Sequence, residues 1–460
     1  MTSMALASDP ADLVLRDRMA EALQLEPVPV TVTGAATLDS PYPVTDFAAA
    51  SIATAGVALA SLLDALGLGH STVTVRRELS EGWFTSAVRP VGWSPPPPWD
   101  AIAGDYLASD GWIRLHTNAP AHRAAALRVL GVEAVRESVA RAVAAWQAEA
   151  LETAVVEEGG CAAVMRSPAE WARHPQGAAV AREPLVSRQQ TGKADDSFSR
   201  WEGTRERPLA GLRVLDLTRV LAGPVATRLL AGLGADVLRI DPPDWEEPAL
   251  VPDMTLGKRS ARLDARDPDG LGRLIELLRG SDVIVHGYRP DALDQLGLGE
   301  KVRRETRPGL VDVSLDAYGH TGPWANRRGF DSLVQMSSGI AEAGMRAIAA
   351  EVPTPLPVQA LDHATGYLAA AAVLTGLAGR VRKGRGWRGR LSLARTAVEL
   401  ENARGLPRAS HFLDAVELPA DPLDTPWGRA MLLHSPLELG GVSVRWERAP
   451  RDLGADDPRW

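Results

Sequence analysis

The chain has 460 residues, 45% of them hydrophobic, which is enough apolar material for two or three domains with cores of their own. Its formal net charge of -8 argues against a nucleic-acid partner, because a phosphate-binding surface normally shows a basic excess. Cys161 is the only cysteine, so no internal disulfide can form. Together with opening residues that lack the pattern of a secretory signal, this predicts a cytoplasmic protein.

An alanine-rich segment near the N-terminus, residues 47–63, is apolar enough to resemble a short membrane span. It contains Ser51, Thr54 and Ser61 and is followed at once by Asp64, so we expect a buried helix and no membrane partner. Residues 1–99 as a whole are expected to be a helical segment.

Two aspartates introduce similar segments far apart in the chain. Asp46 precedes an alanine-rich helix that ends at glycines and leads into an apolar strand, and Asp362 precedes the same arrangement. The similarity suggests a duplicated fragment. An aspartate ahead of such a helix is usually an N-cap, and that role is compatible with chemistry at the same carboxylate.

A smaller α+β domain is expected over residues 100–186, after the stiff run Pro95 to Pro98. Short strands and helices alternate there, and Ser167 with Glu170 has the spacing of a capping box at a helix start. Residues 187–207 are polar and charged, so we interpret them as the main interdomain linker.

From Pro208 onward, strands and helices alternate in the manner of a parallel sheet with crossover helices. The predicted fold class is α/β: a Rossmann-like doubly wound parallel sheet over residues 208–345, a smaller α+β domain, and alanine-rich connecting helices. Residues 346–460 would hold the helix after Asp362 and a closing segment. Ligands are expected at the carboxyl ends of the strands, which are predicted at 214–217, 237–240, 261–263, 283–285 and 310–315.

A dinucleotide is the first ligand to consider for such a sheet, but the glycines do not support it. Gly223 stands alone after the first strand, whereas the fingerprint needs three glycines in a tight turn near the pyrophosphate. The sequence also has no Walker loop and no cluster with metal-ligand spacing, so we predict neither a metal nor a tightly bound cofactor.

The order of several short motifs is more specific than any one of them. They are RVLDLTRVLAGP (213–224), LGADVLRID (233–241), GKRSARLD (257–264), GYRPDALDQLGLG (287–299) and YGHTGPWANRRGFDSLVQMSSG (318–339). With Asp362 they resemble the class III CoA-transferases, collinearly from Pro208 to about Val398.

The resemblance implies that coenzyme A or an acyl-CoA binds as a substrate across the strand ends. Arginine and lysine side chains at these positions suit phosphates because they supply several charged donors. The implied contacts are Leu221, Ala222, Lys258, Leu263, Asp264, Ala265, Arg266, Gly287, Tyr288, Arg289, Arg328, Gly329, Phe330 and Asp331.

The resemblance further implies that Asp362 is the nucleophile that moves CoA from an acyl-CoA to a carboxylic acid through an aspartyl-CoA thioester. The amide dipoles at the start of the following helix favour an ionised carboxylate there. His363 is expected to be structural, and Asp46 is the alternative site, which lacks the preceding sheet motifs.

Several features depart from the family pattern. The region resembling the smaller domain precedes the sheet instead of following the aspartate, no convincing glycine-rich loop is found, and Gly257 and Gly287 stand where asparagine is commoner. Two alternatives therefore stay open. One is an α-methylacyl-CoA racemase, which would carry a histidine at the position of Phe330, and the other is a non-catalytic CoA-binding subunit. The resemblance also implies a homodimer.

Overall fold

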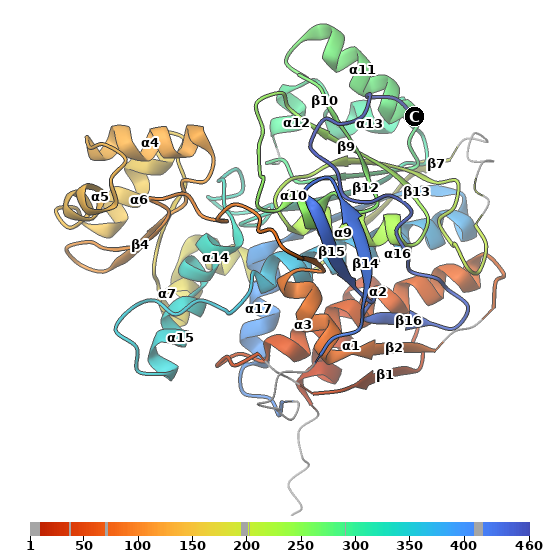
Figure 1. Ribbon diagram of the computed structural model, residues 1–460, viewed down its shortest axis with the longest axis horizontal. Coiled ribbons are helices and arrows are strands. Elements are labelled where there is room, and N and C mark those ends of the chain that lie inside the picture. Colours follow the sequence, from red (N-terminus) through yellow and green to blue (C-terminus); the bar gives the residue numbers. More distant parts are fainter. Residues whose placement is uncertain are drawn as a thin grey trace, which may run out of the picture.

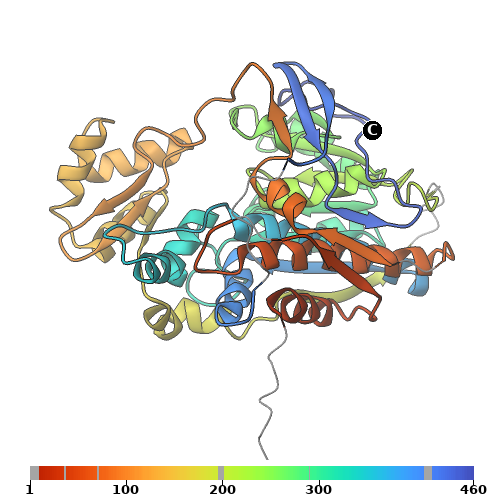
Figure 2. The same ribbon diagram turned by 60° about the horizontal axis from the view of Figure 1, so that its bottom comes forward.

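The computed structural model describes residues 10–35, 38–69, 72–194, 201, 203–289, 291–408 and 417–460. A central sheet with its helices occupies one side of the molecule, and a separate small domain projects from the other (Figures 1 and 2). The N-terminal and C-terminal segments lie together beside the central sheet.

The central sheet confirms the predicted α/β class. Its six parallel strands follow the order 3-2-1-4-5-6 when numbered along the chain, the order of a doubly wound sheet whose two halves diverge from the first strand. A seventh strand is added antiparallel at one edge. In spatial order the strands are β10 (Arg259–Arg262), β9 (Asp236–Asp241), β8 (Arg213–Leu217), β11 (Val283–His286), β12 (Val311–Asp316), β13 (Arg385–Ser392) and β7 (Ser187–Lys193).

The edge strand β7 corrects the interpretation of residues 187–207 as a linker. Its sequence, SRQQTGK, pairs with β13, placing Ser187 opposite Arg390. An edge strand needs only one neighbour, and its backbone bonds to β13 do not depend on apolar side chains. A polar heptapeptide can therefore extend a sheet whose inner strands are apolar.

Alternating side chains of the strands build two cores, one on each face of the sheet. Leu215, Leu238 and Ile284 pack against α11 (Pro268–Arg279) and α12 (Ala292–Gln295), near α13 (Glu300–Thr306). Their neighbours Val214 and Val237 face α9 (Ala222–Gly232) and α16 (Ala360–Lys383). This period of two is what burial on both faces requires.

The small domain has its own hydrophobic core, formed between three antiparallel strands and three helices. It is attached to the sheet domain by an ion pair between Glu152 and Arg327 at 3.0 Å and by a hydrogen bond from the Arg166 amide to the Met336 carbonyl. Its elements are β4 (Gly104–Leu107), β5 (Trp112–Leu115), α4 (Pro120–Leu130), α5 (Arg136–Val143), α6 (Ala148–Glu157) and β6 (Ala162–Val164).

Two short helices, α7 (Pro168–Arg173) and α8 (Pro175–Val180), lead from the small domain back to the sheet. The predicted capping box at the start of α7 is confirmed, since Ser167 and Glu170 each bond the other's backbone amide. Cys161, just before β6, is buried.

The N-terminal segment is not purely helical, which corrects the expectation for residues 1–99. Its three strands lie in two small sheets with strands from the C-terminus, in the orders β1-β2-β16 and β14-β15-β3, where β2 pairs with β16 and β3 with β15. These pairings join residues more than 300 positions apart, so local patterns could not indicate them. The elements are α1 (Ala11–Leu23), β1 (Val30–Thr33), α2 (Val44–Ala65), β2 (Val73–Arg76), α3 (Arg77–Thr85), β3 (Val88–Pro90), β14 (Ala420–Thr425), β15 (Gly428–Leu433) and β16 (Leu437–Leu439).

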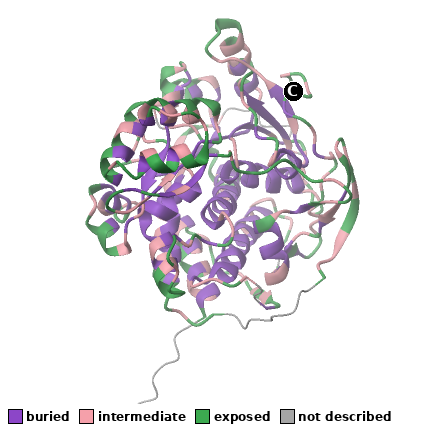
Figure 3. Ribbon diagram, turned by 60° about the vertical axis from the view of Figure 1, so that its left-hand side comes forward, coloured by how far each residue is buried: buried purple, intermediate pink, exposed green. Residues whose placement is uncertain are grey.

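The two alanine-rich helices, α2 and α16, pack against each other in the interior. Both are long and apolar enough to cross a membrane by length and composition alone, yet 94% and 83% of their most apolar stretches are buried within the fold. Figure 3 shows the buried residues gathered in the interior helices and strands, with exposed residues on the outer helices and loops. Core helices of this kind pass the same length test as membrane spans.

Asp46 and Asp362 occupy the same place in these two helices. Each is the third helical residue, so neither is the N-cap that the sequence suggested. Asp46 is instead held in an ion pair with Arg77 at 3.4 Å, and Arg77 also pairs with Asp12. Each helix is followed by a strand in parallel pairing, β2 with β1 and β13 with β12, so the local order of the two segments is the same.

Close packing of α16 on α9 gives a first testable expectation. A Cβ at Gly366 would lie 2.4 Å from the Ala222 carbonyl, so Gly366→Ala should lower the free energy of unfolding by about 1–3 kcal/mol. Gly379 lies in the same helix, and a Cβ added there would have no neighbouring atom within 4 Å, so Gly379→Ala should raise it by about 0.5–1 kcal/mol. Chemical denaturation measures both, and equal changes would contradict the packing described.

Candidate active site

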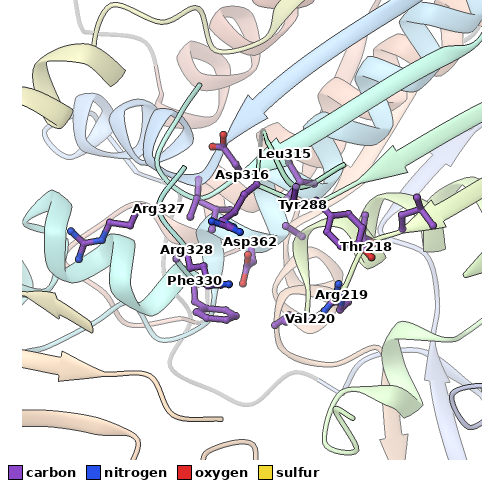
Figure 4. Close-up of a pocket in the computed structure, with 18 of the residues that line it drawn as sticks. Thr218, Arg219, Val220, Tyr288, Leu315, Asp316, Arg327, Arg328, Phe330 and Asp362 are labelled. Carbon is purple, nitrogen blue, oxygen red and sulfur yellow. The ribbon is translucent and has the colours of Figure 1, made fainter. Parts of the chain in front are cut away.

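Asp362 lies where two cavities meet. It lines both of them and is 7% exposed, so its carboxylate is largely removed from bulk water. We call the cavity of about 370 Å³ the basic cavity and the one of about 310 Å³ the apolar cavity. Figure 4 shows Asp362 in the basic cavity, with Phe330 and Arg328 on one side and Val220 and Arg219 on the other.

The basic cavity is built at the carboxyl ends of β8, β11 and β12, where a doubly wound sheet binds its ligands. Four arginines line it, and three of them, Arg219, Arg289 and Arg328, form no ion pair with a described carboxylate. Arg219 lies over the rings of Trp245 and Tyr288, at 4.8 and 5.0 Å from their centroids. The other two, Arg289 and Arg328, stand on the loops that follow β11 and β12.

Arg327 lines the same cavity but is already engaged. Besides its ion pair with Glu152, it lies 3.8 Å from the centroid of the Trp324 ring and donates to the Ala162 carbonyl. It therefore fastens the small domain to the sheet domain and is not available for a ligand in the way that its neighbour Arg328 is.

The apolar cavity lies between the small domain and the sheet domain. Aromatic rings, prolines and aliphatic side chains dominate its wall, and the ring of His116 stacks on Phe330 with centroids 3.7 Å apart. The apolar and aromatic wall residues are Pro97, Pro98, Trp99, Ala119, Val220, Leu221, Trp245, Pro248, Ala249, Leu250 and Phe330.

A second carboxylate holds the start of the helix that carries Asp362. Asp331, the first residue of α14 (Asp331–Ser338), is fully buried and accepts the Asp362 amide at 2.9 Å and the Leu361 amide beside it. Gln335, one turn further along α14, donates to Asp331 and accepts the Leu356 amide at 2.7 Å. Asp331 thus fixes the backbone from which Asp362 projects.

Burial, and then the charge of Asp331, raises the pKa of Asp362 well above its usual value. Burial raises the pKa of Asp331 to about 6, against the opposing effect of its hydrogen bonds. The two carboxyl groups therefore titrate as a pair, and ionising one disfavours ionising the other.

The histidines near the site are neutral around pH 7. Burial lowers the pKa of His116 to about 3 and that of His122 to about 4. His363 likewise has its pKa lowered to about 3, and its ring stacks on Phe84 at 4.9 Å, away from both cavities. The expectation that His363 has a structural role agrees with this contact.

Most of the residues that the resemblance implied lie together around Asp362. The basic cavity brings together Ala222, Gly287, Tyr288, Arg289, Arg328, Gly329 and Phe330, and the apolar cavity adds Leu221 and Asp331. Leu263, Asp264, Ala265 and Arg266 line neither cavity; Arg266 and Asp264 form an ion pair with each other at the surface.

The prediction that Lys258 contacts CoA is wrong, because this lysine is not placed to bind a phosphate. Its side chain is fully buried behind β8, where the ammonium group pairs with Asp216 at 3.1 Å and donates to the Pro224 carbonyl. A cation so enclosed neutralises the buried Asp216 carboxylate, which would otherwise be costly in the core.

Sequence reasoning missed Arg219, His116, His122 and Trp245. Arg219 could have been predicted, because it lies two residues after the first strand of the sheet, at the edge where ligands bind. The two histidines come from the small domain, and only the folded arrangement of the two domains brings them to Phe330.

No group of three or more His, Cys, Asp or Glu residues that could hold a metal ion is found within the described ranges.

Comparison with known proteins identifies the family of the sheet domain. Residues 209–408 match the model of CoA-transferase family III. Among curated relatives, succinyl-CoA:glutarate CoA-transferase of Mus musculus is 35% identical over 195 residues, covering 39% of this chain and 44% of its own. A probable fatty acyl-CoA transferase of Mycobacterium tuberculosis is 35% identical over 198 residues, covering 39% and 48%.

A longer match joins the chain to an acyl-CoA transferase of Gibberella moniliformis, 30% identical over 306 residues, with 61% of this chain and 53% of that protein covered. The crystal structure of Rv3272 from M. tuberculosis superposes with a TM-score of 0.40, at 32% identity, covering 43% of this chain and 57% of that one. The chain spans about half the length of the curated relatives it matches. Its residues 209–408 belong to CoA-transferase family III.

The coupling of the two carboxyl groups predicts a shift in titration. Asp331→Asn removes the negative charge beside Asp362 while keeping an oxygen that can accept the Asp362 amide, so the pKa of Asp362 should fall by about 1 unit or more. Carboxyl titration followed by NMR measures this. Glu158→Gln removes one negative charge from an exposed pair on the small domain and should leave the titration unchanged. An unmoved Asp362 in Asp331→Asn would contradict the coupling.

Proposed function

We propose that this protein transfers CoA from an acyl-CoA donor to a free carboxylic acid, with Asp362 as the nucleophile. The observation that carries the proposal is the place of Asp362, a buried carboxylate at the meeting point of an arginine-lined cavity and an apolar one. Membership in CoA-transferase family III supports a reaction on CoA thioesters.

The basic cavity suits the CoA half of the substrate. Arg289 and Arg328 lack carboxylate partners among the described residues, and guanidinium groups in that condition bind phosphates well. Arg219 is held over two aromatic rings, which keeps its charge near the cavity without neutralising it. With the phosphates at these arginines, the pantetheine arm would run toward Asp362 and carry the thioester to it.

The proposed reaction proceeds by four acyl transfers. The Asp362 carboxylate attacks the thioester carbonyl, the C–S bond breaks, and CoA thiolate leaves behind a mixed anhydride. The thiolate then attacks the Asp362 carbonyl, which releases the donor's free acid and leaves an aspartyl-CoA thioester. An acceptor carboxylate repeats the two steps in reverse and restores the ionised Asp362.

The surroundings of Asp362 affect this chemistry in two ways. Burial and the Asp331 charge raise its pKa, and a more basic carboxylate is a better nucleophile once ionised. Amide dipoles at the start of α16 favour negative charge at the same place and so oppose complete protonation. Activity should accordingly rise with pH as Asp362 ionises.

One observation favours a second candidate, an α-methylacyl-CoA racemase. Phe330 stands where a racemase carries histidine, but neutral His116 stacks directly on Phe330 and lines the apolar cavity with Asp362. Incubation of a 2-methylacyl-CoA in heavy water tests this reading, because racemisation exchanges the α-proton and CoA transfer does not. If the protein bound acyl-CoA but catalysed neither reaction, the remaining alternative would be a non-catalytic CoA-binding subunit.

We also propose that the protein is a cytoplasmic homodimer that needs no tightly bound cofactor. A single, buried cysteine supports a reducing compartment. Sedimentation of the full chain would test the dimer.

The nucleophile is tested by Asp362→Asn, which should abolish CoA transfer because the amide cannot form the anhydride. CoA affinity should stay within a few-fold of the parent, since the substitution leaves the arginines in place. Hydroxylamine added with acyl-CoA should modify Asp362 in the parent and leave Asp46, which is ion-paired with Arg77, unmodified. Retained turnover in Asp362→Asn, or modification of Asp46, would refute the assignment.

The CoA-binding role of the basic cavity is tested by Arg289→Ala and Arg328→Ala. Each should weaken CoA binding by roughly 1 to 3 kcal/mol, the usual range for losing a charged hydrogen-bond partner. Arg128→Ala is the matched control, because Arg128 is exposed on α4 and pairs only with Glu158 at 2.7 Å among described carboxylates. If calorimetry gave the same affinity for all three variants, CoA would not bind in this cavity.

A further inference from the structure

The wall of the apolar cavity has an unusual charge pattern. No lysine or arginine occurs among the described residues that line it. His116, the one histidine in the wall, has a pKa of about 3 because of burial, so it is uncharged at neutral pH. Among the described residues, the wall itself therefore offers no cation to a ligand, and Arg114 lies outside it, over the Trp99 ring at 4.9 Å.

The wall does contain acids besides Asp331 and Asp362, and each is engaged in holding the protein together. Asp100 accepts the Thr117 hydroxyl at 2.8 Å and lies 3.3 Å from Arg123. Glu247 pairs with the buried Arg239 at 2.6 Å and accepts the Val220 amide and the Trp245 indole N–H.

Glu246, the third such acid, is mostly exposed at the rim and pairs with Arg262. All three add negative potential to the cavity, while the cations that balance them stand behind them. A second carboxylate placed in this cavity would meet acids and no counter-ion.

The wall also holds three uncharged polar residues, Asn118, Ser332 and Gln359, and the rest of it suits an apolar group. The rings of Trp99 and His116 meet edge to face at 5.8 Å, and the His116 ring in turn stacks on Phe330. Together with Leu221 and Leu250 they enclose about 310 Å³ beside Asp362, enough for a branched aliphatic or phenyl group.

We infer that the apolar cavity receives the acyl group, and that this group is uncharged: an aliphatic or aromatic monocarboxylic acid, with dicarboxylic acids excluded. The inference rests on the proposed function, because it assigns the side of Asp362 opposite the arginines to the acyl half of the thioester. Succinyl-CoA:glutarate CoA-transferases occur among the relatives, so family membership alone does not lead to this specificity.

The test compares two thioesters of the same shape, 4-methylpentanoyl-CoA and succinyl-CoA. The terminal isopropyl group of the first has the size and branching of the terminal carboxylate of the second, so the pair differs in charge. Each thioester is incubated with the full-length protein and its own free acid labelled with carbon-13, and label entering the thioester is measured by mass spectrometry. This self-exchange needs no knowledge of the natural acceptor.

We expect kcat/KM for exchange to be on the order of 100-fold higher with 4-methylpentanoyl-CoA, because an unpaired carboxylate would be desolvated among acids. Phenylacetyl-CoA should also exchange. Equal rates, or faster exchange of succinyl-CoA, would overturn the inference and leave the proposed transfer intact. If no thioester exchanged, the transfer proposal would fail. Calorimetric binding of the same two thioesters would then test the acyl specificity. Equal affinities would overturn the inferred specificity, and tighter binding of 4-methylpentanoyl-CoA by a similar factor would support it.

A charge placed in the wall should reverse the preference. Ala249 is a half-buried wall residue, and Ala249→Arg should raise kcat/KM for succinyl-CoA at least tenfold relative to 4-methylpentanoyl-CoA. Leu107→Arg adds the same charge at a position 55% exposed on β4, outside the cavity, and should leave the ratio unchanged. Thermal unfolding confirms that both variants are folded. An unchanged ratio in folded Ala249→Arg would show that the acyl group lies elsewhere.

Discussion

The site depends on one buried contact, the Asp331 carboxylate accepting the backbone amides of Leu361 and Asp362. The first turn of a helix has amides without partners inside the helix, and here a carboxylate from a different helix satisfies two of them. Hydrogen bonds to a charged group of this kind contribute about 1.5–3 kcal/mol each. The contact joins α14 to α16 and fixes the backbone at Asp362. Because the same carboxylate raises the pKa of Asp362, the position and the ionisation of Asp362 have a common cause.

The rest of the chain surrounds α16 so that this contact stays buried. Helices α2 and α9 pack on it, and the C-terminal segment closes over α3 and α9 through Trp446, which stacks on Trp83 at 4.9 Å and donates to the Arg228 carbonyl. Trp446 also explains why residue 257 is a glycine. Its φ of +79° favours glycine, and a Cβ there would lie 2.4 Å from the indole. The glycine at a position where the family more often has asparagine is thus explained by a tryptophan 189 residues later in the sequence.

Local sequence patterns predicted the parts of the fold that depend on local signals. Strands β8, β9, β11 and β12 are apolar runs set between helices, and the motifs at their ends supplied most of the residues around Asp362. The pairing of β7 with β13, and of N-terminal with C-terminal strands, was not predictable because it joins polar or short segments across long separations. Lys258 was misplaced for a related reason, since a lysine beside a strand gives no sign of which face of the sheet it enters. His116 and His122 reach the site only through the docking of the small domain.

Asp362 lies on a boundary between two electrostatic environments, and that boundary orients any thioester bound across it. On one side are arginines with no described carboxylate partner, and on the other are acids, aromatic rings and a neutral histidine. A CoA thioester is strongly anionic at its nucleotide end and can be uncharged at its acyl end. Only one direction of binding then places the phosphates beside cations, and in that direction the thioester carbonyl comes to the carboxylate between the two cavities. The charge pattern of the two walls would therefore orient the substrate so that its thioester bond lies beside Asp362, before any contact with the reacting atoms is made.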